Sequence, residues 1–255
     1  MTKNYKFSII TVVYNAKEAI KDTVKSIQNQ IYKNFEHIII DGASTDGTME
    51  YIKSLDFNNI RYISEKDNGI YDAMNKGIKH ANGEYFLFLN AGDKFASNDI
   101  LDKIANKIEK LEIQPKIIYG GANVFEENGK FVTTLKALKF NKQNLNRFAT
   151  RTVCHQSIFV HKDSVVMYSS KYRLKGELNW YYDLVNKVEQ KYICKTEDII
   201  CDYYLGGTGD INFWENYFER IKVTKEHNNL FNFIITMPFF LIPLIFRLRR
   251  KIFGR

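Results

Sequence analysis

Apolar runs and amphipathic segments alternate along the first part of the chain. Residues 7–13, FSIITVV, form a mainly apolar run rich in β-branched side chains, which is typical of a buried strand. Apolar positions then recur at helical spacing, at Ala16, Ile20, Val24, Ile27 and Ile31. The pattern predicts a strand followed by an amphipathic helix.

The same unit repeats twice more before the pattern changes. Strands are predicted at 37–40, 60–64 and 85–89, with helices after Gly47 and over 70–81. Strands that are almost entirely apolar and that alternate with helices form parallel sheets covered on both faces. We therefore expect one α/β body with a mostly parallel sheet.

The rest of the chain alternates less regularly. A helix carries Ile100, Leu101, Ile104, Ile108 and Leu111, and short strands are predicted at 117–120, 123–125 and 131–135. A strand at 156–161 and a helix over 178–188 follow. This half is predicted to be a mixed arrangement of strands and helices.

Residues 230–246 are strongly apolar but contain two prolines, Pro238 and Pro243, and precede the basic sequence RLRRK. A spanning helix needs about 20 apolar residues, so this run is too short and too interrupted to cross a bilayer. We expect it to lie in the cytoplasmic leaflet, where anionic lipids hold the arginines. The alternative is a helical hairpin packed on the protein's own surface.

Composition and charge exclude several classes. Hydrophobic residues make up 45% and charged residues 26% of the 255 residues, which is typical of a folded globular protein. The net charge of +8 comes largely from the last nine residues, and no nucleic-acid-binding motif occurs, so nucleic acid is not an expected partner. The three cysteines have the spacing of neither a disulfide framework nor a zinc site. The N-terminus lacks the features of a signal peptide, which favours a reducing cytoplasm.

Polar residues follow each predicted parallel strand. In such sheets, ligands bind beyond the carboxyl ends of the strands, where the loops converge. The residues at these positions are Thr11, Tyr14, Asn15, Asp41, Ser44, Asp46, Glu65, Asp67, Asn68, Asn90 and Asp93.

Four segments carry a family resemblance: SIITVVYN, IIIDGASTDGT, EKDNGIYDAMNKGI and GEYFLFLNAGD, in this order over residues 6–95. They resemble the nucleotide-binding half of inverting family-two glycosyltransferases. CHQSIFV, the Glu177 region and YYLGGTG resemble the acceptor half of bacterial members that build surface polysaccharides. The resemblance implies a GT-A fold, a Rossmann-type, mostly parallel sheet flanked by helices. We expect a nucleotide-sugar-binding half at 1–95, a mixed acceptor-side half at 96–228, and a C-terminal apolar and basic helical segment at 229–255 that associates with the membrane.

The resemblance assigns nucleotide-binding roles to Thr11, Tyr14, Asn15, Asp41, Ser44, Asp67, Asn68 and Asn90. Asp41 is expected to accept hydrogen bonds from the uracil edge, and Tyr14 to stack on the base. Asp67 and Asn68 precede a helix whose free N–H groups suit phosphate or ribose. Helix capping is the alternative for Asn68 and the favoured role of Asp46, while Tyr14 could instead pack under its loop.

Asp93 is the expected ligand of Mg²⁺ or Mn²⁺. A diphosphate leaving group develops negative charge, which such a cation neutralises while needing only one or two protein carboxylates. The family commonly has an Asp-x-Asp cluster here, whereas this chain has Asn90 at the first acidic position.

Inverting transfer needs a base on the acceptor side. Glu177 and Asp183 are the candidates, and six residues apart on one helix they cannot face the same cleft. Glu177 lies where the family has its base, and Trp180 and Tyr181 share its face and are candidates to stack on a sugar. His155 is an acceptor-side candidate, and Gly206 and Gly207 belong to a loop that we expect to close over the diphosphate.

The resemblance thus implies transfer from a nucleotide-diphosphate sugar, with UDP as the expected nucleotide, to a growing, lipid-linked glycan at the inner face of the cell membrane. Two alternatives remain. Asn90 favours an inactive nucleotide-sugar-binding protein, and a sugar-phosphate nucleotidyltransferase shares the architecture. The first strand–helix turn, VVYNAKEA, lacks the glycine-rich activating loop of the latter class.

Overall fold

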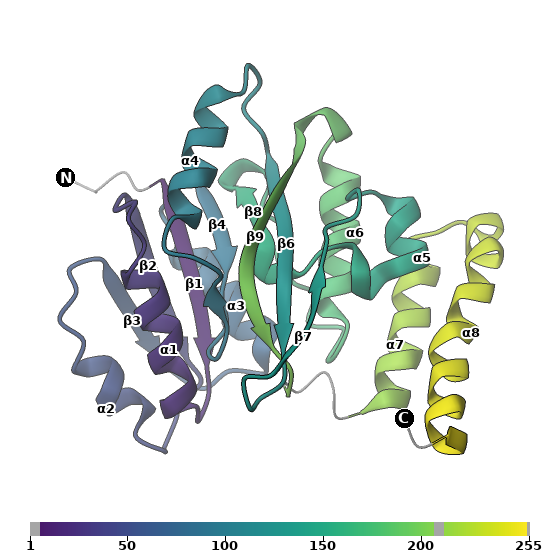
Figure 1. Ribbon diagram of the computed structural model, residues 1–255, viewed down its shortest axis with the longest axis horizontal. Helices are drawn as coiled ribbons and strands as arrows, with labels where there is room; N and C mark the ends of the chain where they lie inside the picture. The colour runs from purple at the N-terminus through teal and green to yellow at the C-terminus, as the bar shows by residue number, and fades with distance from the viewer. Residues whose placement is uncertain (1–5, 207–211, 254–255) are drawn as a thin grey trace.

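The computed structural model describes residues 6–206 and 212–253 (Figure 1). These residues form a nine-stranded sheet in the order β3-β2-β1-β4-β8-β6-β9-β5, with β7 added on β6. Helices cover both faces of this sheet. The predicted fold class, a mixed α/β body with a parallel first half, is confirmed.

The first half follows the predicted alternation closely. Its strands are β1 (Phe7–Val13), β2 (Phe35–Asp41), β3 (Ile60–Ser64) and β4 (Tyr85–Phe88), and its helices are α1 (Lys17–Gln28), α2 (Thr48–Lys53) and α3 (Ile70–His80). The four strands are parallel, and the register pairs Val13 with Asp41 and Asp41 with Ser64. The carboxyl ends of the first three strands therefore lie side by side at one edge of the sheet.

The second half is mixed, as its irregular pattern predicts. Its elements are β5 (Lys94–Phe95), α4 (Ile100–Lys110), β6 (Ile117–Phe125), β7 (Phe131–Leu135), α5 (Lys142–Thr152), β8 (Ile158–His161), α6 (Gly176–Lys187) and β9 (Ile193–Tyr204). β8 runs antiparallel to both β4 and β6, whereas β9 is parallel to β6. The two short strands predicted at 117–120 and 123–125 are one strand, β6, because Gly120 and Gly121 continue the extended backbone beside β9.

Alternate residues of the central strands supply separate apolar layers. Ile10 and Val12 of β1 pack with α3 and α6, while Phe7 and Ile9 pack with α4 on the other side. α3 lies so close to β1 that a Cβ atom on Gly77 would lie 2.3 Å from Ile10 Cγ2. This close packing of α3 on β1 fixes the position of the helix, and with it the position of its first turn at the edge of the sheet.

The chain ends in two helices, α7 (Phe213–Glu226) and α8 (Leu230–Phe253), which lie at one end of the molecule (Figure 1). α8 continues as a helix through Pro238 and Pro243, so the prolines do not divide the apolar run. Among the described residues, none of the helices combines the length and the apolar character needed to cross a bilayer.

Candidate active site

A pocket of about 430 Å³ opens at the carboxyl ends of β1, β2 and β3. Its lining residues are Tyr14, Gly42, Ala43, Lys66, Asp67 and Gly69. Tyr14 is 65% exposed, so its ring is free to meet a ligand rather than packed beneath its loop. Gly42 lets the loop approach Asp67 closely, because a Cβ there would lie 2.6 Å from Asp67 Oδ2.

The two loops beside this pocket brace each other. The Asn15 N–H donates to Ser44 Oγ at 2.8 Å, and Asn15 Oδ1 accepts from the Thr45 N–H at 2.8 Å. Asn15 and Ala43 have φ angles of 46° and 64°, a left-handed conformation that non-glycine residues adopt at a cost of about 1 to 3 kcal/mol. Asn15 and Ser44, which the family resemblance assigns to nucleotide binding, thus hold the pocket in shape.

Asp41 lies at the base of the same loops and is fully buried. Its carboxylate accepts from the Ser44 N–H at 3.1 Å and from Ser64 Oγ at 2.6 Å. Asp46 instead joins two helix N-termini, since it accepts from the N–H groups of Lys17 and Thr48, the first residues of α1 and α2. The N-cap residue of α2 is Gly47, without a side-chain cap, so Asp46 is not the N-cap favoured from the sequence but stabilises the start of α2 from the position before it.

Thr11 does not lie in the first loop, where the sequence analysis placed it. It is a fully buried residue of β1, which continues to Val13. Its hydroxyl donates to the Leu89 carbonyl at 2.8 Å. Because that bond uses the only hydroxyl proton, the oxygen accepts from His37 Nε2 at 2.9 Å. Burial lowers the pKa of His37 to about 3, which keeps this pair neutral. The prediction that Thr11 contacts the nucleotide is therefore corrected to a role inside the sheet.

The start of α3 is shaped by acidic side chains rather than by Asn68. Asp67 Oδ1 accepts from the Gly69 N–H at 2.8 Å, and the Asn68 N–H donates to Asp72 Oδ2 at 3.0 Å. The N-cap residue is Gly69, without a side-chain cap, so the alternative that Asn68 caps α3 is wrong. Asp67 and Asn68 lie at the rim of the pocket beside a helix N-terminus.

Asp93, between β4 and β5, is 5% exposed. Its Oδ2 accepts from Gln156 Nε2 at 2.8 Å and its Oδ1 from the Tyr204 N–H at 3.0 Å. Burial raises the pKa of Asp93 to about 7, although both hydrogen bonds favour the charged form. The contact of Asp93 with Gln156 and Tyr204 was not predicted, since Gln156 lies within a short 3₁₀ turn and Tyr204 ends a strand that was not predicted.

Asn90 and His155 meet next to Asp93. Asn90 Nδ2 lies 3.2 Å from His155 Nε2, while Asn90 Oδ1 is buried and has no hydrogen-bond partner among the described residues. A buried amide oxygen without a donor loses its hydration energy with no compensation, and this indicates a ligand that approaches it. No group of three or more His, Cys, Asp or Glu side chains arranged to bind a metal occurs in the part of the chain that the structure describes.

The residues at 90–93 nevertheless fit a divalent cation held mainly by a substrate. One carboxylate and one neutral oxygen are hard donors of the kind that Mg²⁺ and Mn²⁺ accept. Asp93, whose two oxygens each accept a hydrogen bond in this structure, would supply the carboxylate, and the orphaned Asn90 Oδ1 would supply the second oxygen. A diphosphate and water would complete the coordination.

Glu177 lies in the first turn of α6, and its side chain is 28% exposed. Its Oε2 accepts from the Tyr71 hydroxyl at 2.5 Å, and Lys175 Nζ lies 3.5 Å from Oε1. Tyr71 belongs to α3 and stands two residues after Gly69, which lines the pocket. Glu177 is therefore linked to the same sheet edge as the pocket.

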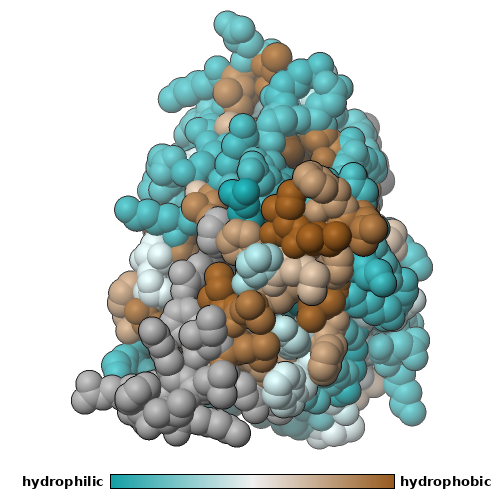
Figure 2. Space-filling model, turned by 90° about the vertical axis from the view of Figure 1, so that its right-hand side faces the viewer, coloured by the Kyte–Doolittle hydropathy of each residue, from teal (hydrophilic) through white to brown (hydrophobic). Residues whose placement is uncertain are grey.

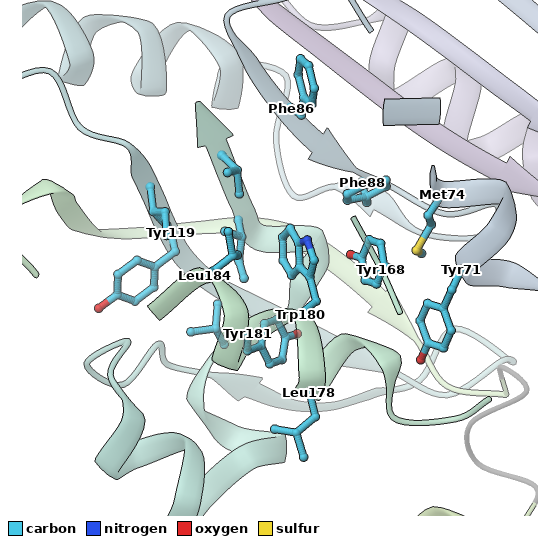
Figure 3. Packing of buried hydrophobic residues seen from close by; sticks show 14 of the residues in the cluster. Tyr71, Met74, Phe86, Phe88, Tyr119, Tyr168, Leu178, Trp180, Tyr181 and Leu184 are labelled. Atoms are coloured by element: carbon cyan, nitrogen blue, oxygen red, sulfur yellow. The ribbon is translucent and has the colours of Figure 1, made fainter. Parts of the chain in front are cut away.

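Trp180 and Tyr181 are 1% and 4% exposed, so the suggestion that they stack on a sugar is wrong. Trp180 packs parallel to Tyr168 with ring centroids 5.1 Å apart and donates its indole N–H to the Val166 carbonyl (Figure 3). Both rings lie in the core because α6 packs its apolar side on the sheet. Asp183 turns away from Glu177 toward α7, where it accepts from Asn179 Nδ2 at 2.7 Å and lies 3.9 Å from His227.

Gly206 has a φ angle of 112°, and a Cβ atom there would collide with the Glu127 side chain. The positive φ angle explains the preference for glycine just after β9. Gly207 lies outside the described residues, so closure of this loop over a diphosphate stays a prediction.

Comparisons with known proteins show the family of the chain. The family model described as Glycosyl transferase family 2 matches residues 8–168. An uncharacterized glycosyltransferase of Mycobacterium tuberculosis is 38% identical over 112 residues, which cover 44% of this chain and 42% of that protein. A PGL/p-HBAD biosynthesis glycosyltransferase of Mycobacterium bovis is 30% identical over 187 residues, covering 70% of this chain and 68% of the relative. The chain thus spans less than half of the first of these relatives.

Solved structures share the fold at low sequence identity. TarS residues 1–349 of S. aureus, in complex with UDP-GlcNAc, matches with a TM-score of 0.67 and 16% identity over 87% of this chain and 66% of that chain. A mannosyltransferase of Pyrobaculum calidifontis, in complex with GDP-Man and Mn²⁺, matches with a TM-score of 0.55 and 17% identity over 86% of this chain and 61% of that chain. The GT-A expectation for the fold is confirmed.

Proposed function

The chain belongs to glycosyltransferase family 2, and we propose that it transfers a sugar from a nucleotide-diphosphate sugar, most simply a UDP-sugar, to a hydroxyl group of a glycan. The observation that carries this proposal is the joining of two features at one sheet edge. The pocket bounded by Tyr14 and Asp67 opens there. Tyr71, in the first turn of α3 directly after the pocket residue Gly69, donates a hydrogen bond to the Glu177 carboxylate. One side holds a donor, and the other presents a base.

The proposed reaction is a single displacement with inversion at the anomeric carbon. Glu177 takes the proton of the acceptor hydroxyl as its oxygen forms the new bond to the anomeric carbon. The bond from that carbon to the diphosphate oxygen breaks, and the nucleoside diphosphate leaves with the electron pair. Asp93 and Asn90 would hold Mn²⁺ or Mg²⁺, which when bound neutralises charge on the diphosphate. Asp41, Asp67 and Asn68 are proposed to position the nucleotide.

Calorimetric titration with UDP, with and without Mn²⁺, tests the donor site. We expect UDP to bind more tightly with Mn²⁺, and Tyr14→Ala to weaken binding about tenfold, because a stacked ring contributes about 1 to 3 kcal/mol per base. Tyr62→Ala is the matched control, since Tyr62 is also exposed, at 45%, but lies on β3 outside the pocket lining.

Absence of binding to UDP and GDP under every condition would overturn the donor site. Binding without turnover of any sugar donor would favour the inactive binding protein. Release of pyrophosphate from a nucleoside triphosphate and a sugar phosphate would favour a nucleotidyltransferase.

We further propose that segment 229–255 holds the protein at the anionic inner surface of the cell membrane, where a lipid-linked acceptor would reside. Exposed apolar side chains recur on one face of α8, at Leu230, Phe231, Ile234, Ile235, Met237, Leu241 and Ile242. Trp214 and Phe218 of α7, 49% and 61% exposed, extend the apolar surface. Figure 2 shows hydrophobic side chains gathered in one patch at this end of the molecule.

Charge favours a lipid surface as the partner of this patch. Arg247, Arg249, Arg250 and Lys251 follow in the sequence, and each basic residue near an anionic bilayer contributes about 1 kcal/mol. An apolar face beside basic residues is typical of helices that lie in the interfacial plane.

Sedimentation of the full chain with vesicles tests this proposal. The wild type is expected to bind vesicles that contain phosphatidylglycerol and to bind phosphatidylcholine vesicles weakly, and Ile234→Asn with Leu241→Asn to reduce binding at least tenfold. Ile113→Asn, an equally exposed residue at 54% in the loop after α4, is the control. Wild-type binding by the double variant, or a stable dimer that does not bind vesicles, would contradict the proposal.

A further inference from the structure

The hydrogen bond between Tyr71 and Glu177 joins the two halves of the site. Tyr71 comes from α3 of the donor-side half, and Glu177 from α6 of the acceptor-side half, 106 residues later in the chain. The distance of 2.5 Å from the Tyr71 hydroxyl to Glu177 Oε2 is that of a strong hydrogen bond to a carboxylate. Neither the sequence pattern nor the family resemblance gave Tyr71 a role.

The Tyr71 ring is held firmly where this bond requires it. It is 8% exposed and stacks on Tyr168 at 5.3 Å between ring centroids, and Tyr168 in turn stacks on Trp180 (Figure 3). Gly176 lies against the other part of the ring, where a Cβ atom would approach Tyr71 Cε2 to 2.5 Å. α6 can therefore begin at this point only because residue 176 is glycine.

The two oxygens of Glu177 are in different environments. Oε2 is occupied by the Tyr71 hydroxyl, whereas the polar neighbour of Oε1 is Lys175 Nζ at 3.5 Å, and part of the side chain is open to solvent. Tyr168 and Tyr181 also surround the carboxylate, and His155 interacts with it electrostatically from the β8 side. Two groups donate hydrogen bonds to it: Tyr71 to Oε2 at 2.5 Å and Lys175 Nζ to Oε1 at the longer distance of 3.5 Å.

We propose, on the basis of the proposed transferase function, that Tyr71 is a positioning residue that fixes Glu177 Oε2 and leaves Oε1 as the oxygen that takes the acceptor proton. Because Tyr71 stands two residues after Gly69, the donor pocket and the base are held at a constant separation. Tyr71 itself need not touch either substrate.

Steady-state kinetics of Tyr71→Phe test this role, since the variant keeps the ring and removes only the hydroxyl. The expected result is a fall in kcat of about ten- to a hundredfold with little change in the donor KM. A general loosening of the fold would weaken donor binding as well, so a lower kcat at an unchanged donor KM separates the positioning of Glu177 from a merely structural role.

Tyr172→Phe is the matched control, because the Tyr172 hydroxyl donates a comparably short bond to Glu226 of α7, outside the site. It should leave kcat and the donor KM unchanged. If Glu177→Gln is inactive and Tyr71→Phe has the kcat and the donor KM of the wild type, the positioning role is overturned while the base survives. If the wild type transfers no sugar, or Glu177→Gln stays active, the failure belongs to the proposed function instead.

Discussion

Glu177→Gln is expected to reduce the rate of sugar transfer by a factor of about 10² to 10⁴, the range that general-base catalysis contributes. The amide keeps the shape of the side chain and can still accept a hydrogen bond from the Tyr71 hydroxyl through Oε1, so the fold should persist. Single-turnover transfer measures the effect, and UDP titration shows whether the donor site is intact. Unchanged UDP affinity with lost transfer is the expected combination.

Asp183→Asn provides the comparison on the same helix. Asp183 is 37% exposed, accepts from Asn179 and faces His227, and it makes no contact with the pocket. We expect near-wild-type transfer from this variant. The opposite pattern, with Asp183→Asn inactive and Glu177→Gln active, would transfer the role of base to Asp183 and require a different acceptor cleft.

The donor side of the site was largely predictable from sequence because it depends on local order. In a parallel sheet with short loops, residues that follow successive strands must meet at one edge. Asp41, Asn15 and Ser44 could be brought together from the pattern alone. Thr11 was misplaced although its strand was predicted at 7–13, because the sequence does not show whether a polar side chain near the end of an apolar strand meets a ligand or is buried against neighbouring strands.

The acceptor side was less predictable because its contacts join distant segments. β9 contains Lys195, Glu197 and Asp198 beside Ile199 and Ile200, so neither a strict alternation nor an apolar run marks it as a strand. Without β9, the approach of the Tyr204 N–H to Asp93 cannot be foreseen. The burial of Trp180 was missed for a similar reason. Helical spacing shows which residues share a face with Glu177, but the side that packs on the sheet follows from Tyr168, which lies in an irregular segment.

Asp93→Asn is expected to abolish the effect of Mn²⁺ on UDP binding and to lower transfer at least about a hundredfold, because the carboxylate is the only acidic ligand proposed for the cation. The fold should tolerate the change. The Oδ1 atom of the new asparagine side chain can accept from the Tyr204 N–H. Its Nδ2 can donate to Gln156 Oε1 if the Gln156 side-chain amide rotates by half a turn, which places Gln156 Nε2 beside Cys154 Sγ. Calorimetry with UDP and Mn²⁺ measures the loss, and Mn²⁺-dependent binding equal to wild type would exclude Asp93 as a ligand.

The same substitution should stabilise the metal-free protein at alkaline pH. Burial raises the pKa of Asp93 from 3.8 to about 7, so between these values the folded protein retains a proton that the unfolded chain has lost. Stability is therefore lost as the pH rises through this window, by roughly 4 kcal/mol above pH 7 if no cation is bound. Asp93→Asn lacks this titration, and its Tm in EDTA should exceed that of the wild type by clearly more at pH 8 than at pH 5, where only part of the loss has accrued. Asp163→Asn is the control. The hydrogen bond from Lys116 lowers the pKa of this exposed carboxyl, so any effect of the substitution on stability should be small and opposite in sign.

A Tm difference between Asp93→Asn and the wild type that does not depend on pH would show that burial of the Asp93 charge does not limit stability. The expected pH-dependent difference would mean that the fold tolerates a destabilising carboxylate at a place where a cation can offset its charge.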